Sequence, residues 1–356
     1  MRKAVRLFCR LIAYLIFMAA AQSCCIHLWP DPEAEETDAT LVLHLKFNPD
    51  FYIWEHTYDA ETGTLQESHP SQAIHQDHPG TTDVYDNTLA VGEMRHIVRI
   101  YPAGEPVNHI KEIVYTNVNG GRYDCDIPLV LEPGSYDVVV WSDLAENSGD
   151  DHIYDHNDFL SINLAADHVA NSDFRDGFRG KLHIDIQASE DYEATVGMYR
   201  PMAKYEFIAT GLQDFIERET TRTDGSRADL SSYRVVFTYP NFLPCSYNAV
   251  DDRIIDSRSG VSFESKMTQV GSDEVSFGFD YVMINSVAQA ARSSQGVSVM
   301  VAVYDPDGEQ VAQSVPITVP LRRDDHTVIR SAFLSVNSKG GVAIDPNYEG
   351  DFNVWM

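Results

Sequence analysis

The chain has 356 residues and a formal net charge of −28, with 54 acidic side chains against 26 basic ones. This charge argues against nucleic acid and anionic membrane surfaces as partners, because both are bound mainly through Lys and Arg. The length is enough for two domains of ordinary size.

The N-terminus has the layout of a secretory signal peptide. Four basic residues precede the apolar run Leu11 to Ala21, which is too short to span a bilayer by itself. Ser23 then precedes Cys24, with small residues close upstream, and this arrangement resembles a bacterial lipobox. The resemblance implies removal of residues 1–23 and lipidation of Cys24, and several acyl chains would anchor the chain stably. An ordinary cleaved signal is the alternative, and Cys25 has no assigned role.

An acidic tether and a first strand follow the signal. Residues 24–39 carry several acidic residues, two prolines and no basic residue, which is typical of a semi-extended, solvated segment. From Thr40 onward, Leu41, Leu43, Leu45 and Phe47 alternate with other residues. This period of two predicts a half-buried β-strand.

Similar runs recur along the rest of the chain. Alternating patterns predict strands at residues 94–102, 109–116, 135–143, 180–187, 202–209, 232–240, 260–267, 275–284, 297–308, 313–321 and 326–336. Short strands broken by Gly, Pro, Asn and Asp are typical of sandwiches or barrels. One short helix is predicted around Leu212 to Glu219, where three apolar side chains share a face.

A weak internal repeat favours a duplicated architecture. Residues 95–102 resemble residues 233–240, and each run ends in Tyr-Pro. We therefore predict an all-β chain with two tandem transthyretin-like or Greek-key β-sandwiches, at residues 40–192 and 193–356. The boundary is expected near Asp191 to Tyr199, and the short helix belongs to the second domain.

No catalytic motif is present in the sequence, so we expect no enzyme activity, no catalytic residue and no cofactor. Two loops contain enough ligand-type side chains to consider a metal. They are the histidine-rich stretch with His69, His75, Asp77 and His78, and the acidic stretch Ser142 to Phe159, which would suit calcium. Exposed imidazoles and ordinary turn residues are the simpler interpretation of both, so no metal site is assigned.

The remaining cysteines and the tryptophans leave further alternatives open. Cys125 and Cys245 are far apart in sequence, and we favour unbridged buried thiols over a disulfide. Four tryptophans could form a sugar-stacking platform, although core or edge positions are the commoner use in a sandwich. They are Trp29, Trp54, Trp141 and Trp355.

Several stretches carry a family resemblance. The runs "RHIVRIYP", "PGSYDVVVWSDL", "FRDGFRG", "RPMAKYEFI" and "GVAIDPNY", together with the lipobox-like start, resemble the FimB-type fimbrial anchor and accessory lipoproteins of Gram-negative gut and oral anaerobes. The resemblance implies two transthyretin-like sandwiches, a surface location on the outer membrane, and fimbrial subunits of the same assembly as partners. Such a protein would serve as the base or a minor component of a pilus.

The resemblance also gives the first strand a role. Polymerising subunits of that superfamily are implied to lose their first strand to an Arg-specific protease, and a neighbour's strand then fills the groove. Here no Lys or Arg occurs between Lys46 and Arg95. We therefore predict that the strand with Leu41, Leu43, Leu45 and Phe47 is retained.

The resulting prediction is a non-enzymatic outer-membrane lipoprotein that acts as a fimbrial anchor or accessory subunit through β-strand contacts. The alternative is a glycan-binding surface lipoprotein of a nutrient-uptake system. A calcium-dependent adhesin is a third hypothesis.

Overall fold

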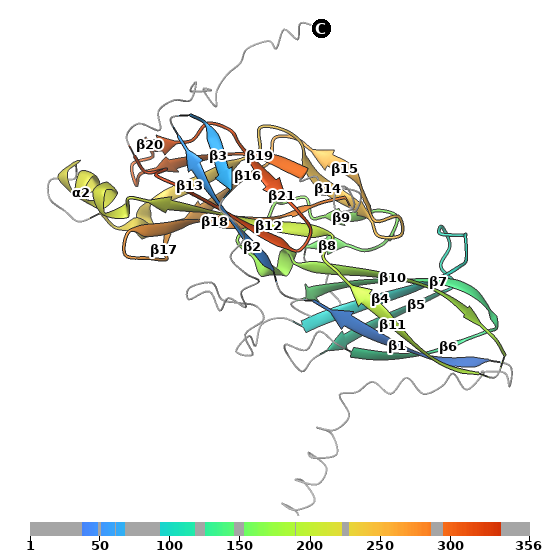
Figure 1. Cartoon of the computed structure of the whole chain (residues 1–356). Helices are drawn as coiled ribbons and strands as arrows, with labels where there is room; N and C mark the ends of the chain where they lie inside the picture. The colour runs from blue at the N-terminus through green and yellow to red at the C-terminus, as the bar shows by residue number, and fades with distance from the viewer. Residues whose placement is uncertain are drawn as a thin grey trace, which may run out of the picture.

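The computed structural model describes residues 38–48, 51–60, 62–67, 93–117, 125–145, 153–188, 190–222, 228–285 and 295–335. Strands dominate these residues, as Figure 1 shows, so the predicted all-β sandwich class is confirmed. The strands are β1 (Ala39–Phe47), β2 (Tyr52–Asp59), β3 (Thr64–Glu67), β4 (Glu93–Pro102), β5 (Lys111–Asn117), β6 (Cys125–Leu131), β7 (Gly134–Ala145), β8 (Tyr154–Asp155), β9 (Ile162–Leu164), β10 (Gly177–Ile186), β11 (Asp191–Met198), β12 (Met202–Thr210), β13 (Arg234–Thr238), β14 (Leu243–Asn248), β15 (Arg253–Arg258), β16 (Ser262–Lys266), β17 (Thr268–Gln269), β18 (Glu274–Met283), β19 (Gln295–Tyr304), β20 (Gln310–Gln313), β21 (Ile317–Leu321) and β22 (Asp325–Ser331).

The first sandwich packs a three-stranded sheet, in the order β11-β1-β6, against a four-stranded sheet in the order β10-β7-β4-β5. Alternating side chains from both sheets form one core, to which β7 contributes Val138 and Val140. The opposite face of β7 is also buried, because Val139 and Trp141 pack into a separate core beside the second sandwich. This explains why β7 has four consecutive apolar residues, Val138 to Trp141, at its centre.

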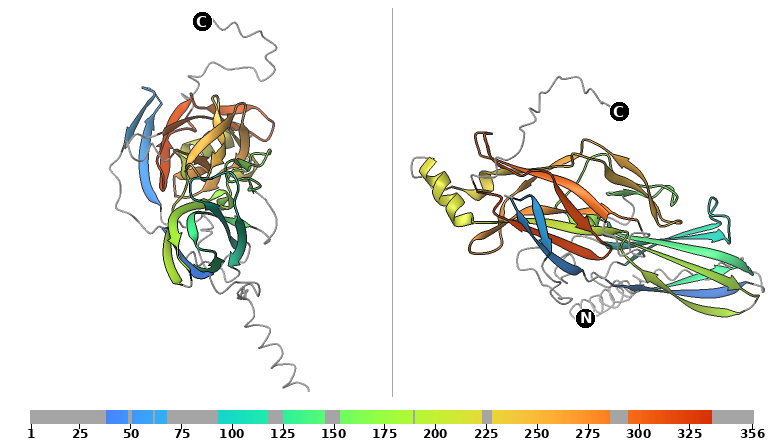
Figure 2. Two further views of the ribbon diagram at one scale, coloured as in Figure 1. Left: turned by 90° about the vertical axis from the view of Figure 1, so that its right-hand side faces the viewer. Right: turned by 45° about the horizontal axis from the view of Figure 1, so that its top comes forward.

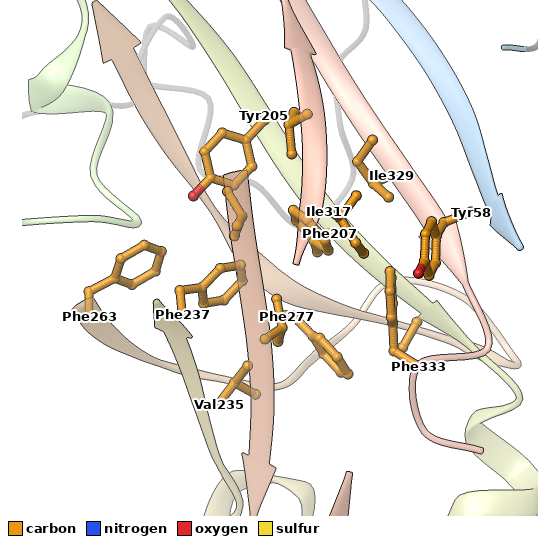
Figure 3. Packing of buried hydrophobic residues seen from close by; sticks show 14 of the residues in the cluster. Tyr58, Tyr205, Phe207, Val235, Phe237, Phe263, Phe277, Ile317, Ile329 and Phe333 are labelled. Carbon is orange, nitrogen blue, oxygen red and sulfur yellow. The ribbon is translucent and has the colours of Figure 1, made fainter. Parts of the chain in front are cut away.

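The second sandwich packs a six-stranded sheet against a smaller one. The first has the order β17-β18-β12-β22-β2-β3, and the second runs β16-β13-β19-β20 with β21 also on β19. Figure 3 shows aromatic side chains meeting between the sheets; Phe207 of β12 makes an edge-to-face contact with Phe237 of β13, with ring centroids 5.7 Å apart. Helix α2 (Leu212–Arg222) begins after Gly211, whose φ is +78°, and buries Leu212 and Phe215. The predicted short helix is therefore present.

Strand pairing does not follow chain order. The strands β2 and β3, from the segment expected in the first domain, pair in the sheet of the second sandwich. In Figure 3, Tyr58 of β2 faces Phe333 within that core. The expected boundary near Asp191 to Tyr199 falls on β11, which pairs with β1 and so lies inside the first sandwich.

The two sandwiches meet along a joint that contains many charged groups. A small sheet in the order β15-β14-β9-β8 takes strands from both halves of the chain and lies beside the joint. Figure 2 shows the sandwiches one after the other along the length of the molecule. Lys204 binds Asp173 at 3.0 Å, and the Arg179 guanidinium donates to the carbonyl oxygens of Ala249 and Val250 at 2.7 and 3.1 Å. A buried ion pair such as that of Lys204 and Asp173 adds little net stability, because desolvation of the two charges offsets most of their attraction.

Candidate functional site: the position of the first strand

The first strand, β1, occupies the middle of its sheet. It runs parallel to β11 and antiparallel to β6, so that Leu43 lies opposite Ala194 on one side and Ile127 on the other. Both edges of β1 are thus satisfied by backbone hydrogen bonds. We call the place between β6 and β11 the first-strand position.

The inner face of β1 is apolar and buried. The side chains of Leu41, Leu43 and Leu45 are 0% exposed and belong to the core of the first sandwich. Phe47 is partly buried and makes an edge-to-face contact with Phe178, with ring centroids 5.1 Å apart. Burial of one leucine side chain is worth about 1.5–3 kcal/mol, so removing β1 would open the core.

The outer face of β1 is polar and joins its neighbours through one histidine. The Nδ1 atom of His44 lies 2.7 Å from Asp126 on β6, and its Nε2 atom lies 3.8 Å from Glu193 on β11. Both carboxylates are exposed, so these contacts contribute little to stability and mainly favour this register.

A buried arginine fixes the end of β1. The Arg200 side chain is 0% exposed; it binds Asp176 at 2.9 Å, and donates to the carbonyl oxygen of Asn48 at 3.3 Å. Its guanidinium also lies 3.9 Å from the ring centroid of Phe51, just before β2 begins. Burial raises the pKa of Asp176, although Arg200 acts in the opposite direction. The sequence patterns do not predict a role for Arg200. The one feature that could have indicated it is a single charged residue between two segments that form strands.

The first arginine after the N-terminal basic cluster is inaccessible. Arg95 lies in β4, is 4% exposed, and donates to both carboxylate oxygens of Asp143 at 3.0 Å. Burial alone would raise the pKa of Asp143, but His156 and Arg95 together hold it below its usual range. A protease would have to unfold β4 to reach this arginine.

The other sequence candidates fall in different places. Cys24, residues 24–37 of the tether, Trp29, Trp355 and the histidine-rich stretch lie outside the described residues, and the last tether residue, Ala39, begins β1. Trp141 is fully buried, while Trp54 is partly exposed on β2. In the part of the chain that the structure describes, no helix is long and apolar enough to cross a membrane. Cys125 and Cys245 form no disulfide, as we expected, but both are only partly buried.

Comparisons with solved structures find proteins of the class that the sequence resembles. The fimbrial anchor protein Mfa2 of Porphyromonas gingivalis is 12% identical, with 77% of this chain and 82% of that one aligned and a TM-score of 0.37. A fimbrial assembly protein of Parabacteroides distasonis is 13% identical over 82% and 90% of the chains, with a TM-score of 0.35. A provisionally assigned adhesin of Bacteroides thetaiotaomicron is 12% identical over 80% and 81%, with a TM-score of 0.42.

The remaining comparisons concern curated proteins and protein families. No functionally curated protein matches the chain. A family model described as a family of unknown function, DUF6562, matches residues 52–355. Because this match covers most of the sequence, the chain belongs to the DUF6562 family.

Proposed function

We propose that the protein is an outer-membrane surface lipoprotein that serves as a fimbrial anchor or accessory subunit, with Cys24 as the lipidated residue. The observation that carries the proposal is the first-strand position. It is filled by the chain's own β1, which closes the core and continues into β2 of the second sandwich. Cleavage after β1 by an Arg-specific protease is opposed by sequence and fold together, because Arg95 is buried.

A retained first strand suits a subunit at the base of an assembly. A subunit whose groove is already filled accepts no donated strand there, so it contacts partners through other surfaces. The edge strand β5 is one such surface, since it pairs only with β4 among the described strands. Three apolar side chains in and before β5 are exposed by 68%, 56% and 48%: Val107, Ile110 and Val114. We propose that fimbrial subunits of the same assembly bind along this edge.

Membrane fractionation tests the anchor. Cys24→Ala should leave the protein unlipidated and release it from the outer membrane, because no acyl chain then holds it. Cys25→Ala is the matched control and should remain in the membrane fraction. Retention of Cys24→Ala in the outer membrane would refute the lipoprotein assignment.

An engineered cut tests the retained strand. Asp50→Arg gives the chain an arginine between β1 and β2 in the sequence, as a cleavage site for an Arg-specific protease. The freed N-terminal fragment is then removed in denaturant and the remaining chain is refolded. This chain should melt at a lower temperature than the uncut variant, and a synthetic peptide of residues 38–48 should restore the melting temperature. An unchanged melting temperature without the fragment would show that β1 does not close the core.

Co-purification from native membranes tests the partner surface. The double variant Ile110→Asp and Val114→Asp should recover fewer fimbrial subunits than wild type, because charge on the edge opposes strand addition. Phe242→Asp, at a side chain that is 70% exposed elsewhere, is the control. Equal recovery with both variants would exclude the β5 edge.

A further inference from the structure

A polar pocket of about 260 Å³ lies where the core of the second sandwich ends. The inner faces of β2 and β22 line much of it. Tyr58 and Ile329 on these strands point into the core, whereas Trp54, His56 and Thr327 line the pocket, as does Asp325. Because Trp54 lies opposite Thr327 in the register, the two strands present a continuous polar wall. We call this the β2–β22 pocket, after the two strands, which pair in parallel.

The pocket contains two buried polar groups that lie beside each other, Asp325 and the Trp54 indole N–H. Asp325 is 6% exposed, and no ion pair to its carboxylate is found among the described residues. Burial raises the pKa of Asp325 to about 7, although the Trp54 indole and Arg322 act against it. The indole nitrogen of Trp54 is buried and makes no well-formed hydrogen bond to the described part of the chain. Buried polar groups are rarely left in this state, so a bound molecule would complete them.

The balance of charge indicates what kind of molecule fits. Glu67 and Asp325 would oppose an anion, whereas Arg322, which lies 4.4 Å from the Trp54 ring centroid, would oppose a cation. Burial lowers the pKa of His56, which favours the neutral imidazole. A neutral ligand that both donates and accepts hydrogen bonds satisfies all of these groups. Hydroxyl groups do both.

Size restricts the ligand further. The volume is that of about eight or nine water molecules at about 30 Å³ each. It lies just below the range of about 300–1,000 Å³ that is usual for drug-sized ligands. One sugar ring is of this scale, and a long oligosaccharide is not.

We propose that the β2–β22 pocket binds one neutral pyranose ring, either a free monosaccharide or the terminal residue of a glycan. The ring hydroxyls donate to Asp325 and accept from the Trp54 indole N–H. The proposal is independent of the fimbrial role, since it rests on side chains of the second sandwich only.

Saturation-transfer NMR on the full chain in detergent tests the proposal. The probes are glucose, galactose, mannose, fucose and N-acetylglucosamine, and the same chain is applied to an array of immobilised glycans. At least one monosaccharide or one terminal sugar should bind. A signal on the array alone identifies a glycan as the source, and binding of the free sugar identifies a monosaccharide. No binding in either experiment overturns the proposal.

Variants locate the binding. Asp325→Asn and Trp54→Phe should each weaken binding about tenfold, since each removes one hydrogen-bonding group while keeping most of the shape. Phe242→Ala removes an exposed aromatic ring outside the pocket and should bind as wild type does. Melting temperatures show whether each variant is folded. Wild-type affinity for the sugar in both folded pocket variants overturns the assignment. It is also overturned if ethylammonium or acetate displaces the sugar and binds as tightly as the sugar does.

The pH dependence of binding is a second readout. Ionised Asp325 accepts hydrogen bonds more strongly than the neutral acid, so affinity should rise between pH 6 and pH 8. The titratable and charged groups that face it are Arg322, Asp324, Glu67 and His56, and burial lowers the pKa of His56. Asp325→Asn should abolish the rise. A rise that persists in this variant would assign the dependence to another group.

Discussion

The strands β1 and β2 follow each other in sequence, and each runs parallel to a strand from much later in the chain. Yet they end in different environments. β1 has partners on both sides and buries three leucines completely, whereas β2 is flanked on one side by the short, mostly exposed β3. An apolar side chain at every second position closes a core. The mixed pattern of β2 places Tyr58 in a core and leaves Trp54 and His56 beside a pocket.

The largest effect is expected where the chain passes from one strand to the other. Arg200→Ala should lower the free energy of unfolding by about 3–5 kcal/mol, because it leaves Asp176 buried without its partner. Chemical denaturation measures the loss. The double variant Arg200→Met and Asp176→Leu should recover much of it, since no charge is then left unpaired. If Arg200→Ala lowers the free energy of unfolding by less than about 1 kcal/mol, the end of β1 is not held by the Arg200–Asp176 pair.

The next largest effect is expected from a leucine in β1, compared with a leucine in β3, the strand beside β2. Leu43→Ala in β1 should cost about 2–5 kcal/mol, because the site is fully buried and cannot collapse easily. Leu65→Ala in β3, at a partly buried position, should cost clearly less. Both values come from urea unfolding. Equal losses of unfolding free energy in the two variants would show that Leu43 is no more important to the core than Leu65.

A third test uses pH at the pocket beside β2. Burial raises the folded-state pKa of Asp325 from 3.8 to about 7, so the folded protein holds this proton more tightly than the unfolded chain. The associated stability is present in full below about pH 4 and is lost as pH rises through 7. Asp325→Asn should therefore unfold less readily than wild type at pH 8, by at most about 4 kcal/mol. The difference should shrink by pH 5, and a constant difference in thermal melts would contradict this account.

The smallest effect is expected on the outer face of β1. His44→Ala should change the free energy of unfolding by no more than about 1 kcal/mol, because the carboxylates that it contacts are exposed. Salt titration of the melting temperature measures this contribution. A loss as large as that of Leu43→Ala would mean that register depends on the polar face.

Periodicity predicted strands well where one face is apolar. The strands β1, β4, β7, β12 and β18 lie within a few residues of their predicted ranges. Periodicity does not predict β2, because the polar His56 interrupts the alternation of apolar residues between Trp54 and Tyr58. Periodicity does not predict β11 either, because Asp191, Glu193 and Gly197 interrupt its apolar pattern. Tertiary contacts decide whether such segments form strands, because pairing with a neighbouring strand outweighs a weak local preference.

The candidate site was predictable in part. Alternation alone indicated that Leu41, Leu43 and Leu45 share a buried face, and the structure places them there. The sequence gives no sign of the strands that flank them, since β6 and β11 lie far along the chain. The lipidation of Cys24 stays a prediction, because that residue lies outside the described part.

By itself, the sequence determined that the chain is acidic, built of short alternating strands, and free of Lys and Arg between Lys46 and Arg95. These properties are local, and each can be read from neighbouring residues. The tertiary structure alone decided that β1 fills the first-strand position, that β2 joins the other sandwich, and that Arg95 and Arg200 are buried. The reason is that a period of two suits many partners equally, so only the packing of the whole chain selects among them.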